Sequence, residues 1–171
     1  MKKIKPFIPR ENIEKKVSEI ASKINKDYKN KKLFIVSILT GSVIFCSDII
    51  RKLKVDFELD FIRVSSYNGK KSSGQIKFIA DTAIDMKGKD VLIIEDICDT
   101  GRTLSYIKDL FIKRKANSVK ICVLINRNSE KVKTVDIDYT GFCIEKEFIV
   151  GYGLDYDGKY RGLPYIGKLE D

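Results

Sequence analysis

The sequence predicts an α/β fold in which a mainly parallel central sheet is flanked by helices. Three short apolar runs, at 33–39, 90–95 and 118–125, have polar boundaries and no alternation, which is typical of strands buried on both faces. Segments with apolar residues at helical spacing separate these runs, as in chains built from β-α-β units. The chain has 171 residues, the length of one domain, and we expect residues 1–171 to form a single domain.

The first half of the chain alternates helix and strand patterns. An amphipathic helix with lysines on its other face is predicted by the spacing of Ile13, Val17, Ile20, Ala21 and Ile24. Residues 40–42 turn the chain from the strand at 33–39 into a second helix, whose apolar positions include Val43, Ile44, Ile50 and Leu53. Residues 55–64 mostly alternate, which predicts a half-exposed strand. Residues 65–74 are small and polar, which predicts a mobile loop.

The second half continues this pattern and then changes. A strand is expected at 75–80, before the buried strand at 90–95. Residues 101–114 read as a helix with four inward residues, Leu104, Ile107, Leu110 and Phe111. After the buried strand at 118–125, the tail from residue 139 is rich in strand and turn patterns. We therefore expect a core of about residues 33–138 and a small hood formed by residues 139–171 together with the N-terminal segment.

The positive charge lies mostly in the first segment. The formal net charge is +9, and residues 1–32 contain 11 lysines and arginines against 4 acidic residues. A basic arm of this kind can bind nucleic acid or another polyanion. We favour a solvated helix face, because no ladder of aromatic residues accompanies the lysines, as a single-strand binder would require. Nucleic acid is therefore not expected as a partner.

The residue inventory excludes several chemistries. The chain has no histidine, so it has no Ser–His or Cys–His pair and no HExxH zinc site, and a general base must be Asp, Glu, Lys, Tyr or Cys. The four cysteines form no CxxC pair and have apolar neighbours, which predicts free, buried thiols in a reducing cytosol: Cys46, Cys98, Cys122 and Cys143. The basic N-terminus is not followed by the apolar segment of a signal peptide, and the longest apolar stretch is too short to span a bilayer. We expect a cytoplasmic protein with no membrane partner.

The most informative segment is the run at 91–104. A buried strand is followed by two adjacent carboxylates, Glu95 and Asp96, then by Asp99 and a Thr-Gly-Arg-Thr loop that opens a helix. Ligands of open α/β sheets bind outside the carboxyl ends of the strands, and backbone N–H groups at a helix N-terminus suit a phosphate monoester. Carboxylates suit a hard cation such as Mg²⁺ or sugar hydroxyls. The run therefore indicates a site for a phosphorylated sugar that also carries a metal-bound polyphosphate.

The same residues also have simpler interpretations. Glu95 and Asp96 could form a solvated strand end, and Asp99 could be a helix N-cap. The coincidence of four hydrophobic residues, three acids and a Thr-Gly-x-Thr loop in one run favours the ligand site. The site is not a Walker A loop, because no GxxxxGK[ST] pattern is present.

The run at 91–104 closely resembles the phosphoribosyl-pyrophosphate (PRPP) motif of type I phosphoribosyltransferases. Residues 147–156 and 160–167, with Gly-Tyr-Gly-Leu-Asp at 151–155, resemble the C-terminal block of the bacterial hypoxanthine (hypoxanthine-guanine) phosphoribosyltransferases. Leu-Thr-Gly-Ser at 39–42 resembles the pyrophosphate loop of that family, and Ser-Ser-Tyr at 65–67 its mobile catalytic loop. The resemblance implies the type I phosphoribosyltransferase fold with its hood.

The resemblance also implies a role for each matching residue. Glu95 and Asp96 would bind the ribose hydroxyls and one Mg²⁺, and Asp99 would be the general base beside N7 of a purine. The 5′-phosphate would lie on Asp99, Thr100, Gly101, Arg102 and Thr103. Pyrophosphate would contact Thr40, Gly41, Ser66, Tyr67 and Arg161. The purine would contact Arg127, Phe148, Ile149 and Asp155, and Asp155 would help to hold a second Mg²⁺.

Without the resemblance, four of these residues have ordinary interpretations. Phe148 would be read as core, Asp155 as a turn residue, Tyr67 as a loop tyrosine and Arg161 as a surface charge. Two positions also depart from the family pattern. Arg127 stands where the family usually has a lysine that donates to the 6-oxo group of the purine; either the guanidinium takes this role, or it turns to solvent and a backbone N–H replaces it. Thr40 stands where the family often has Lys or Arg.

The activity implied is Mg²⁺-dependent transfer of phosphoribose from PRPP to hypoxanthine or guanine, giving IMP or GMP. Two alternatives are a PRPP-binding regulator of the same fold that binds RNA, and a transferase that prefers xanthine. The presence of Asp99, Phe148, Asp155 and Arg161 together argues against a pure regulator, which need not keep purine and metal positions. Members of this family commonly form dimers or tetramers, so a homodimer or homotetramer is expected.

Overall fold

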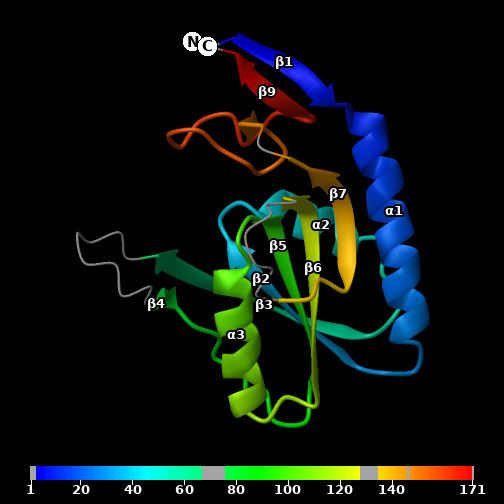
Figure 1. Ribbon diagram of the computed structural model, residues 1–171. Helices are drawn as coiled ribbons and strands as arrows, with labels where there is room; N and C mark the ends of the chain where they lie inside the picture. The colour runs from blue at the N-terminus through cyan, green and yellow to red at the C-terminus, as the bar shows by residue number, and fades with distance from the viewer. Residues whose placement is uncertain (1–2, 67–75, 128–134, 146, 171) are drawn as a thin grey trace.

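The computed structural model describes residues 3–66, 76–127, 135–145 and 147–170, and contains a large sheet with helices on both faces (Figure 1). The large sheet has six strands in the order β4-β3-β2-β5-β6-β7. Their bounds are Ile76–Ala80, Phe57–Ser66, Leu33–Leu39, Asp90–Cys98, Ser118–Arg127 and Tyr139–Ile144. All neighbouring pairs are parallel except β3–β4, so the predicted α/β class with a mainly parallel sheet is confirmed.

The three apolar runs form the centre of this sheet, with side chains packed on both faces. Along β5, Leu92 and Ile94 face one hydrophobic cluster, whereas Val91 and Ile93 face the other. All four side chains are fully buried. Successive side chains of a strand point to opposite faces, so an unbroken apolar run is what a sheet covered on both sides requires.

Three helices cover the two faces: α1 (Arg10–Asp27), α2 (Val43–Ile50) and α3 (Arg102–Lys113). The apolar residues of α1 predicted to face inward are all buried. Its four larger ones belong to a cluster that also contains residues of α2, whereas α3 packs on the opposite cluster. Val43, one of the apolar positions of the second helix, is exposed in the first turn of α2. Among the described residues, no helix combines the length and apolar character needed to cross a membrane.

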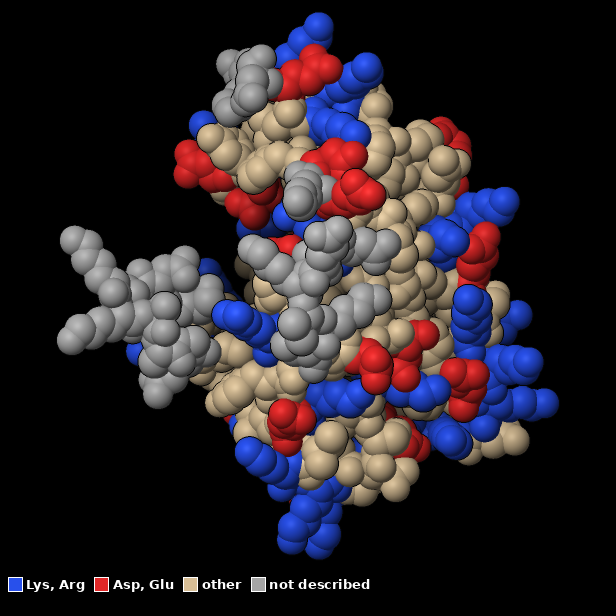
Figure 2. Space-filling view, viewed as in Figure 1, with Lys and Arg blue, Asp and Glu red and all other residues tan. Residues whose placement is uncertain are grey.

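The basic residues of α1 lie on its solvent-facing side, as the helical spacing predicted. Figure 2 shows Lys and Arg side chains along the edge of the molecule occupied by α1 and at its lower end, and a group of Asp and Glu side chains in the upper lobe. Two of the α1 cations pair with carboxylates on the helix itself, Arg10 with Glu14 and Lys16 with Glu19. The prediction that the cations of α1 occupy a solvent-exposed helix face is therefore confirmed.

A second, smaller sheet forms the hood, and it joins the two ends of the chain. Its three antiparallel strands are ordered β1-β9-β8, with bounds Lys3–Ile8, Ile166–Glu170 and Ile149–Val150. Figure 1 shows both termini together at the top of this lobe. We use the word hood for β1, β8, β9 and the loops between β8 and β9.

The structure differs from the predictions in three respects, which are the sheet that β7 joins, the ends of β5 and β6, and the exposure of Cys143. β7 was assigned to the hood, but it pairs with β6 in the large sheet; Gly141 allows this pairing, because a Cβ atom there would overlap the carbonyl of Leu124. The strands expected at 90–95 and 118–125 continue to Cys98 and Arg127. Cys143 is exposed, whereas the other three cysteines are buried as predicted, and all four are free.

Candidate active site

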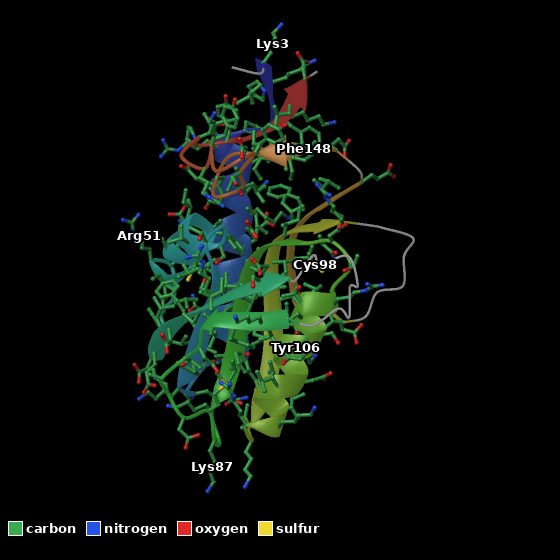
Figure 3. All side chains as sticks on the ribbon, turned by 90° about the vertical axis from the view of Figure 1, so that its left-hand side faces the viewer. Lys3, Arg51, Lys87, Cys98, Tyr106 and Phe148 are labelled. Carbon is green, nitrogen blue, oxygen red and sulfur yellow. The ribbon has the colours of Figure 1, made fainter. Side chains whose placement is uncertain are left out.

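The site candidates gather where the carboxyl ends of the parallel strands face the hood. In Figure 1, β5 and β6 run upward toward the loops between β8 and β9. Figure 3 shows Cys98 at the end of β5 and Phe148 above it in the hood. This edge is where an open α/β sheet binds its ligands, because the strands end there and the following loops are free to vary.

The two adjacent carboxylates lie inside β5, near its carboxyl end, rather than beyond the strand. Asp96 is 9% exposed, and its Oδ1 accepts a bond from the backbone N–H of Ile97 at 2.9 Å. Glu95 Oε1 accepts from the backbone N–H of Asp96 at 3.1 Å. Burial, followed by the neighbouring Asp96, raises the pKa of Glu95 well above its ordinary value. The interpretation of this pair as a solvated strand end is therefore wrong.

The loop at 99–103 forms a small pocket at the N-terminus of α3. The pocket has a volume of about 240 Å³ and is lined by residues 95–104. Gly101 occupies the N-cap position with φ +75°, a left-handed conformation that favours glycine. Asp99 is exposed and is not the N-cap, so that alternative is also wrong. The hydroxyl of Thr100 accepts from the backbone N–H of Arg102 at 3.5 Å, and Thr103 lies in the first turn of the helix.

The turn after β2 contacts both the carboxylates and the hood. The peptide bond between Leu39 and Thr40 is cis. A Cβ atom on Gly41 would overlap the carboxylate of Asp96, and a Cβ atom on Gly153 would overlap the carbonyl oxygen of Gly41. Three segments far apart in the sequence therefore meet at contacts that only glycine allows to be so close.

The hood loop is held in place by Arg161. One guanidinium nitrogen donates to the carbonyl of Gly153 at 2.5 Å, and another pairs with Asp155 at 2.7 Å. Asp155 also accepts from the backbone N–H of Gly158 at 2.8 Å through its second oxygen. Arg161 is thus fixed beside the Gly41 turn, and Asp155 acts as a turn residue as well as an ion-pair partner.

The residues expected around the purine come from β6 and the start of β8. Arg127 ends β6 and donates through Nη2 to the carbonyl of Glu147 at 3.0 Å. This half-buried guanidinium does not turn to solvent, which removes that alternative. Ile149 is buried, but the Phe148 ring is 53% exposed, so its interpretation as core is wrong. The rings of Phe148 and Tyr156 form an edge-to-face pair.

Some residues fall outside these observations, and others were not anticipated. Tyr67, the side chain of Ser66 and the predicted loop through residue 74 lie outside the described residues, and the backbone of Ser66 ends β3. Glu147 and Tyr156 were missed, because the Arg127–Glu147 contact spans 20 positions and a ring contact eight residues apart has no sequence signature. No short-range pattern could have revealed either contact.

The donor set fits a magnesium ion that is shared with a substrate. No group of three or more potential protein ligands occurs in the described part of the chain. Mg²⁺ is usually held by one or two carboxylates together with substrate phosphates, so Glu95 and Asp96 suffice on the protein side. Two adjacent, poorly solvated carboxylates also gain stability from a divalent cation. Asp155 is engaged with Arg161 and belongs to no such group.

Comparison with known proteins defines the class to which this fold and site belong. The sequence profile of the phosphoribosyl transferase domain family matches residues 9–157, so the chain belongs to that family. A hypoxanthine-guanine phosphoribosyltransferase of Streptococcus thermophilus is 44% identical over 168 residues, which cover 98% of this chain and 93% of the relative.

Two crystal structures extend the similarity to the fold. A hypoxanthine-guanine phosphoribosyltransferase of Bacillus anthracis superposes with a TM-score of 0.93 at 37% identity, covering 98% of this chain and all of the other. A hypoxanthine phosphoribosyltransferase of Staphylococcus aureus gives a TM-score of 0.92 at 41% identity, covering 97% of this chain and 91% of the other. The expected type I phosphoribosyltransferase fold is therefore confirmed.

Proposed function

We propose that the protein transfers the 5-phosphoribosyl group of PRPP to N9 of hypoxanthine or guanine, giving IMP or GMP and pyrophosphate, in purine salvage. The observation that carries this proposal is the contact chain from Asp96 through Gly41 and Gly153 to Arg161. It joins the PRPP motif, the turn after β2 and the C-terminal block in one place. The names of the relatives support the choice of 6-oxopurines as acceptors.

PRPP would bind along the edge between β5 and α3. Its 5′-phosphate fits the pocket at Asp99–Thr103, where backbone N–H groups and the α3 dipole favour an anion. The ribose hydroxyls would bond to Glu95 and Asp96, with one Mg²⁺ shared between these carboxylates and the substrate. Thr40, Gly41 and Arg161 would face the pyrophosphate. Asp155 would contact the second Mg²⁺ through lone pairs of its carboxylate that the ion pair with Arg161 does not use.

The reaction substitutes a purine nitrogen for pyrophosphate at C1′ of the ribose. The N9 lone pair forms the new bond, the C1′–O bond breaks, and its electron pair leaves with pyrophosphate. Positive charge develops on the ribose ring, as in glycoside hydrolysis. Asp99 would accept the proton from N7 as N9 reacts, which meets the requirement for a base other than histidine. Arg161 would stabilise the charge on the leaving group, and an Mg²⁺ held by Glu95 and Asp96 would supply further positive charge there.

The purine would lie between Phe148 and the end of β6. A stacked aromatic ring accepts any purine face, so discrimination requires bonds at the base edge. Arg127 Nε is buried and has no partner among the described residues, and this unsatisfied donor fits the 6-oxo group of hypoxanthine or guanine. The backbone at Ile149 would read the opposite edge. Ser66 and Tyr67 would close over the reaction and exclude water, which would otherwise hydrolyse PRPP.

The remaining expectations concern assembly and compartment. We expect a homodimer or homotetramer, which light scattering at several protein concentrations would measure. The four free cysteines support a reducing compartment such as the cytoplasm. No nucleic-acid or membrane partner is part of the proposal.

The deciding experiment is a base-panel assay. The protein is incubated with PRPP, Mg²⁺ and, in turn, hypoxanthine, guanine, xanthine or adenine, and pyrophosphate release is followed. Turnover with hypoxanthine or guanine that stops when EDTA removes Mg²⁺ supports the proposal. A preference for xanthine would change the substrate assignment. Absence of turnover with every base, together with salt-sensitive RNA binding, would overturn the enzyme assignment.

A further inference from the structure

Phe148 carries an exposed aromatic ring and directly precedes a very short strand. It precedes β8, which has only two residues, Ile149 and Val150, and both of these are buried. The Phe148 side chain is 53% exposed and so is not held by surrounding core. An aromatic ring in such a position can change rotamer unless a neighbour restricts it. A stacking platform for a flat ligand requires a ring of defined plane.

Tyr156 supplies such a restriction. The ring centroids of Phe148 and Tyr156 lie 5.4 Å apart with an interplanar angle of 86°, an edge-to-face arrangement. Aromatic pairs favour this geometry, which leaves at least one face of each ring uncovered by the other ring. Tyr156 is 39% exposed, so the pair stands at the surface of the hood loop rather than in the core.

The backbone that carries Tyr156 is firmly held. Tyr156 and Lys159 exchange two backbone hydrogen bonds, at 3.2 and 3.0 Å, which close a tight turn. Asp155 is fixed on one side of this turn by the Gly158 N–H and by Arg161. Arg161 in turn bonds to the carbonyl of Gly153. The backbone position of the Tyr156 ring is therefore fixed, and the ring can restrict the rotamer of Phe148.

We propose that Tyr156 is a positioning residue for purine binding, because its ring holds the plane of Phe148. This inference rests on the proposed function, in which Phe148 stacks on the base. It predicts a selective effect: loss of the Tyr156 ring weakens purine binding, whereas PRPP binding is unaffected, because the proposed PRPP contacts on β5, α3, the Gly41 turn and Arg161 do not involve this ring. The Tyr156 hydroxyl has no part in this role.

The test compares Tyr156→Leu, Tyr156→Gln and Tyr156→Phe with a matched control pair elsewhere. Tyr106 also contacts a phenylalanine ring, that of Phe78 at 6.4 Å, but it lies on α3 away from Phe148 (Figure 3). We expect both ring-removing variants to raise KM for hypoxanthine by about 2- to 10-fold, the range of an aromatic pair. KM for PRPP, and kcat, should change less than twofold. Tyr156→Phe should restore KM, and Tyr106→Leu should match the wild type.

A double-variant measurement separates positioning from general damage. In a Phe148→Leu background, Tyr156→Leu should add little to KM, because its effect acts through the missing ring. Multiplicative effects of the two changes would overturn the inference, as would an unchanged purine KM, an equal rise in KM for PRPP, or a Tyr156→Phe variant as impaired as Tyr156→Leu. Failure of the wild type to use any purine would instead refute the proposed function.

Discussion

At the residue scale, Gly41 occupies the most crowded backbone position of the site. A side chain there would collide with the Asp96 carboxylate, which cannot yield easily because the residue is buried and bonded to Ile97 N–H. We expect Gly41→Ala to raise KM for PRPP at least tenfold, since about 1.4 kcal/mol of lost binding suffices for that. Gly162→Ala is the matched control, because no atom lies within 4 Å of a Cβ placed there. Steady-state kinetics with varied PRPP measures both, and equal KM values for the two variants would contradict the assignment of this turn to PRPP.

Under the proposed function Asp99 acts on the acceptor, and the structure shows that it does not cap a helix. It is exposed directly after β5. The N-cap position of α3 is occupied by Gly101. We expect Asp99→Asn to lower kcat by about 10²–10⁴-fold, the usual contribution of a positioned base. Asp109→Asn, an exposed change of the same charge on α3, should leave kcat near the wild-type value. An unchanged rate in Asp99→Asn would remove that residue from the role of base.

Arg127 offers a test of base recognition. Its Nη2 is bound to the Glu147 carbonyl, so the guanidinium is oriented before substrate arrives. Removing a charged hydrogen bond costs about 1.5–3 kcal/mol, so Arg127→Met should lower kcat/KM for hypoxanthine about 10- to 100-fold. Arg127→Lys should keep or improve use of 6-oxopurines, because an ammonium can donate to the same oxygen. If neither variant alters kcat/KM for any base, Arg127 does not touch the purine.

At the scale of elements, the end of α1 is tied to the sheet through one carboxylate. Asp27, the last residue of α1, accepts from the Tyr139 hydroxyl at 2.6 Å and pairs with Lys120 at 3.0 Å. The Tyr139 hydrogen bond, followed by that of Lys120, lowers the pKa of Asp27 below its ordinary value of 3.8. α1 is thereby joined to β6 and β7, the strands that close this side of the sheet.

Asp27→Asn should lower the free energy of unfolding by about 1 kcal/mol at pH 7, a figure reduced for the partial exposure of the pair. Because the folded-state pKa is depressed, the contribution is fully present above the ordinary value of 3.8 and is lost as the pH falls through the lower folded value. Urea unfolding at pH 7 and near pH 3 measures this. A difference between the proteins that persists undiminished at low pH would contradict the electrostatic explanation.

At the scale of the whole molecule, the hood and the core are connected by few polar contacts. The Tyr152 hydroxyl of the hood loop donates to Asp48 of α2 at 2.6 Å, and burial raises the pKa of Tyr152. Gly153 and Gly41 bring the same two parts together at the site. A ligand bound between hood and core therefore stabilises both.

We expect PRPP with Mg²⁺ to raise the unfolding temperature. At 100 times Kd, mass action contributes about 2.7 kcal/mol, which corresponds to about 5–10 °C for a chain of this size. EDTA should remove most of the shift in unfolding temperature, because the carboxylates of Glu95 and Asp96 would then repel the negatively charged substrate. Thermal unfolding with PRPP alone, Mg²⁺ alone and both measures the coupling. An equal shift with and without EDTA would contradict a shared Mg²⁺.

Most elements of the fold could be predicted from local pattern. The amphipathic spacing of α1 and α3 and the apolar runs of β2, β5 and β6 each fit a helix or a strand whatever the rest of the chain does. The errors have a common cause. β7 joined the large sheet and Cys143 is exposed, because pairing and burial at these positions depend on which surface packs against them.

The sequence by itself determined the fold class and the carboxylate-rich end of β5, because these depend on periodicity and residue type over a few positions. Only the tertiary structure decided that Gly41, Asp96 and Gly153 meet, that Asp155 pairs with Arg161, and that Phe148 is exposed against Tyr156. These contacts join segments up to 112 positions apart, or depend on how a loop folds back. Strand order and packing bring them together, and no local pattern encodes that geometry.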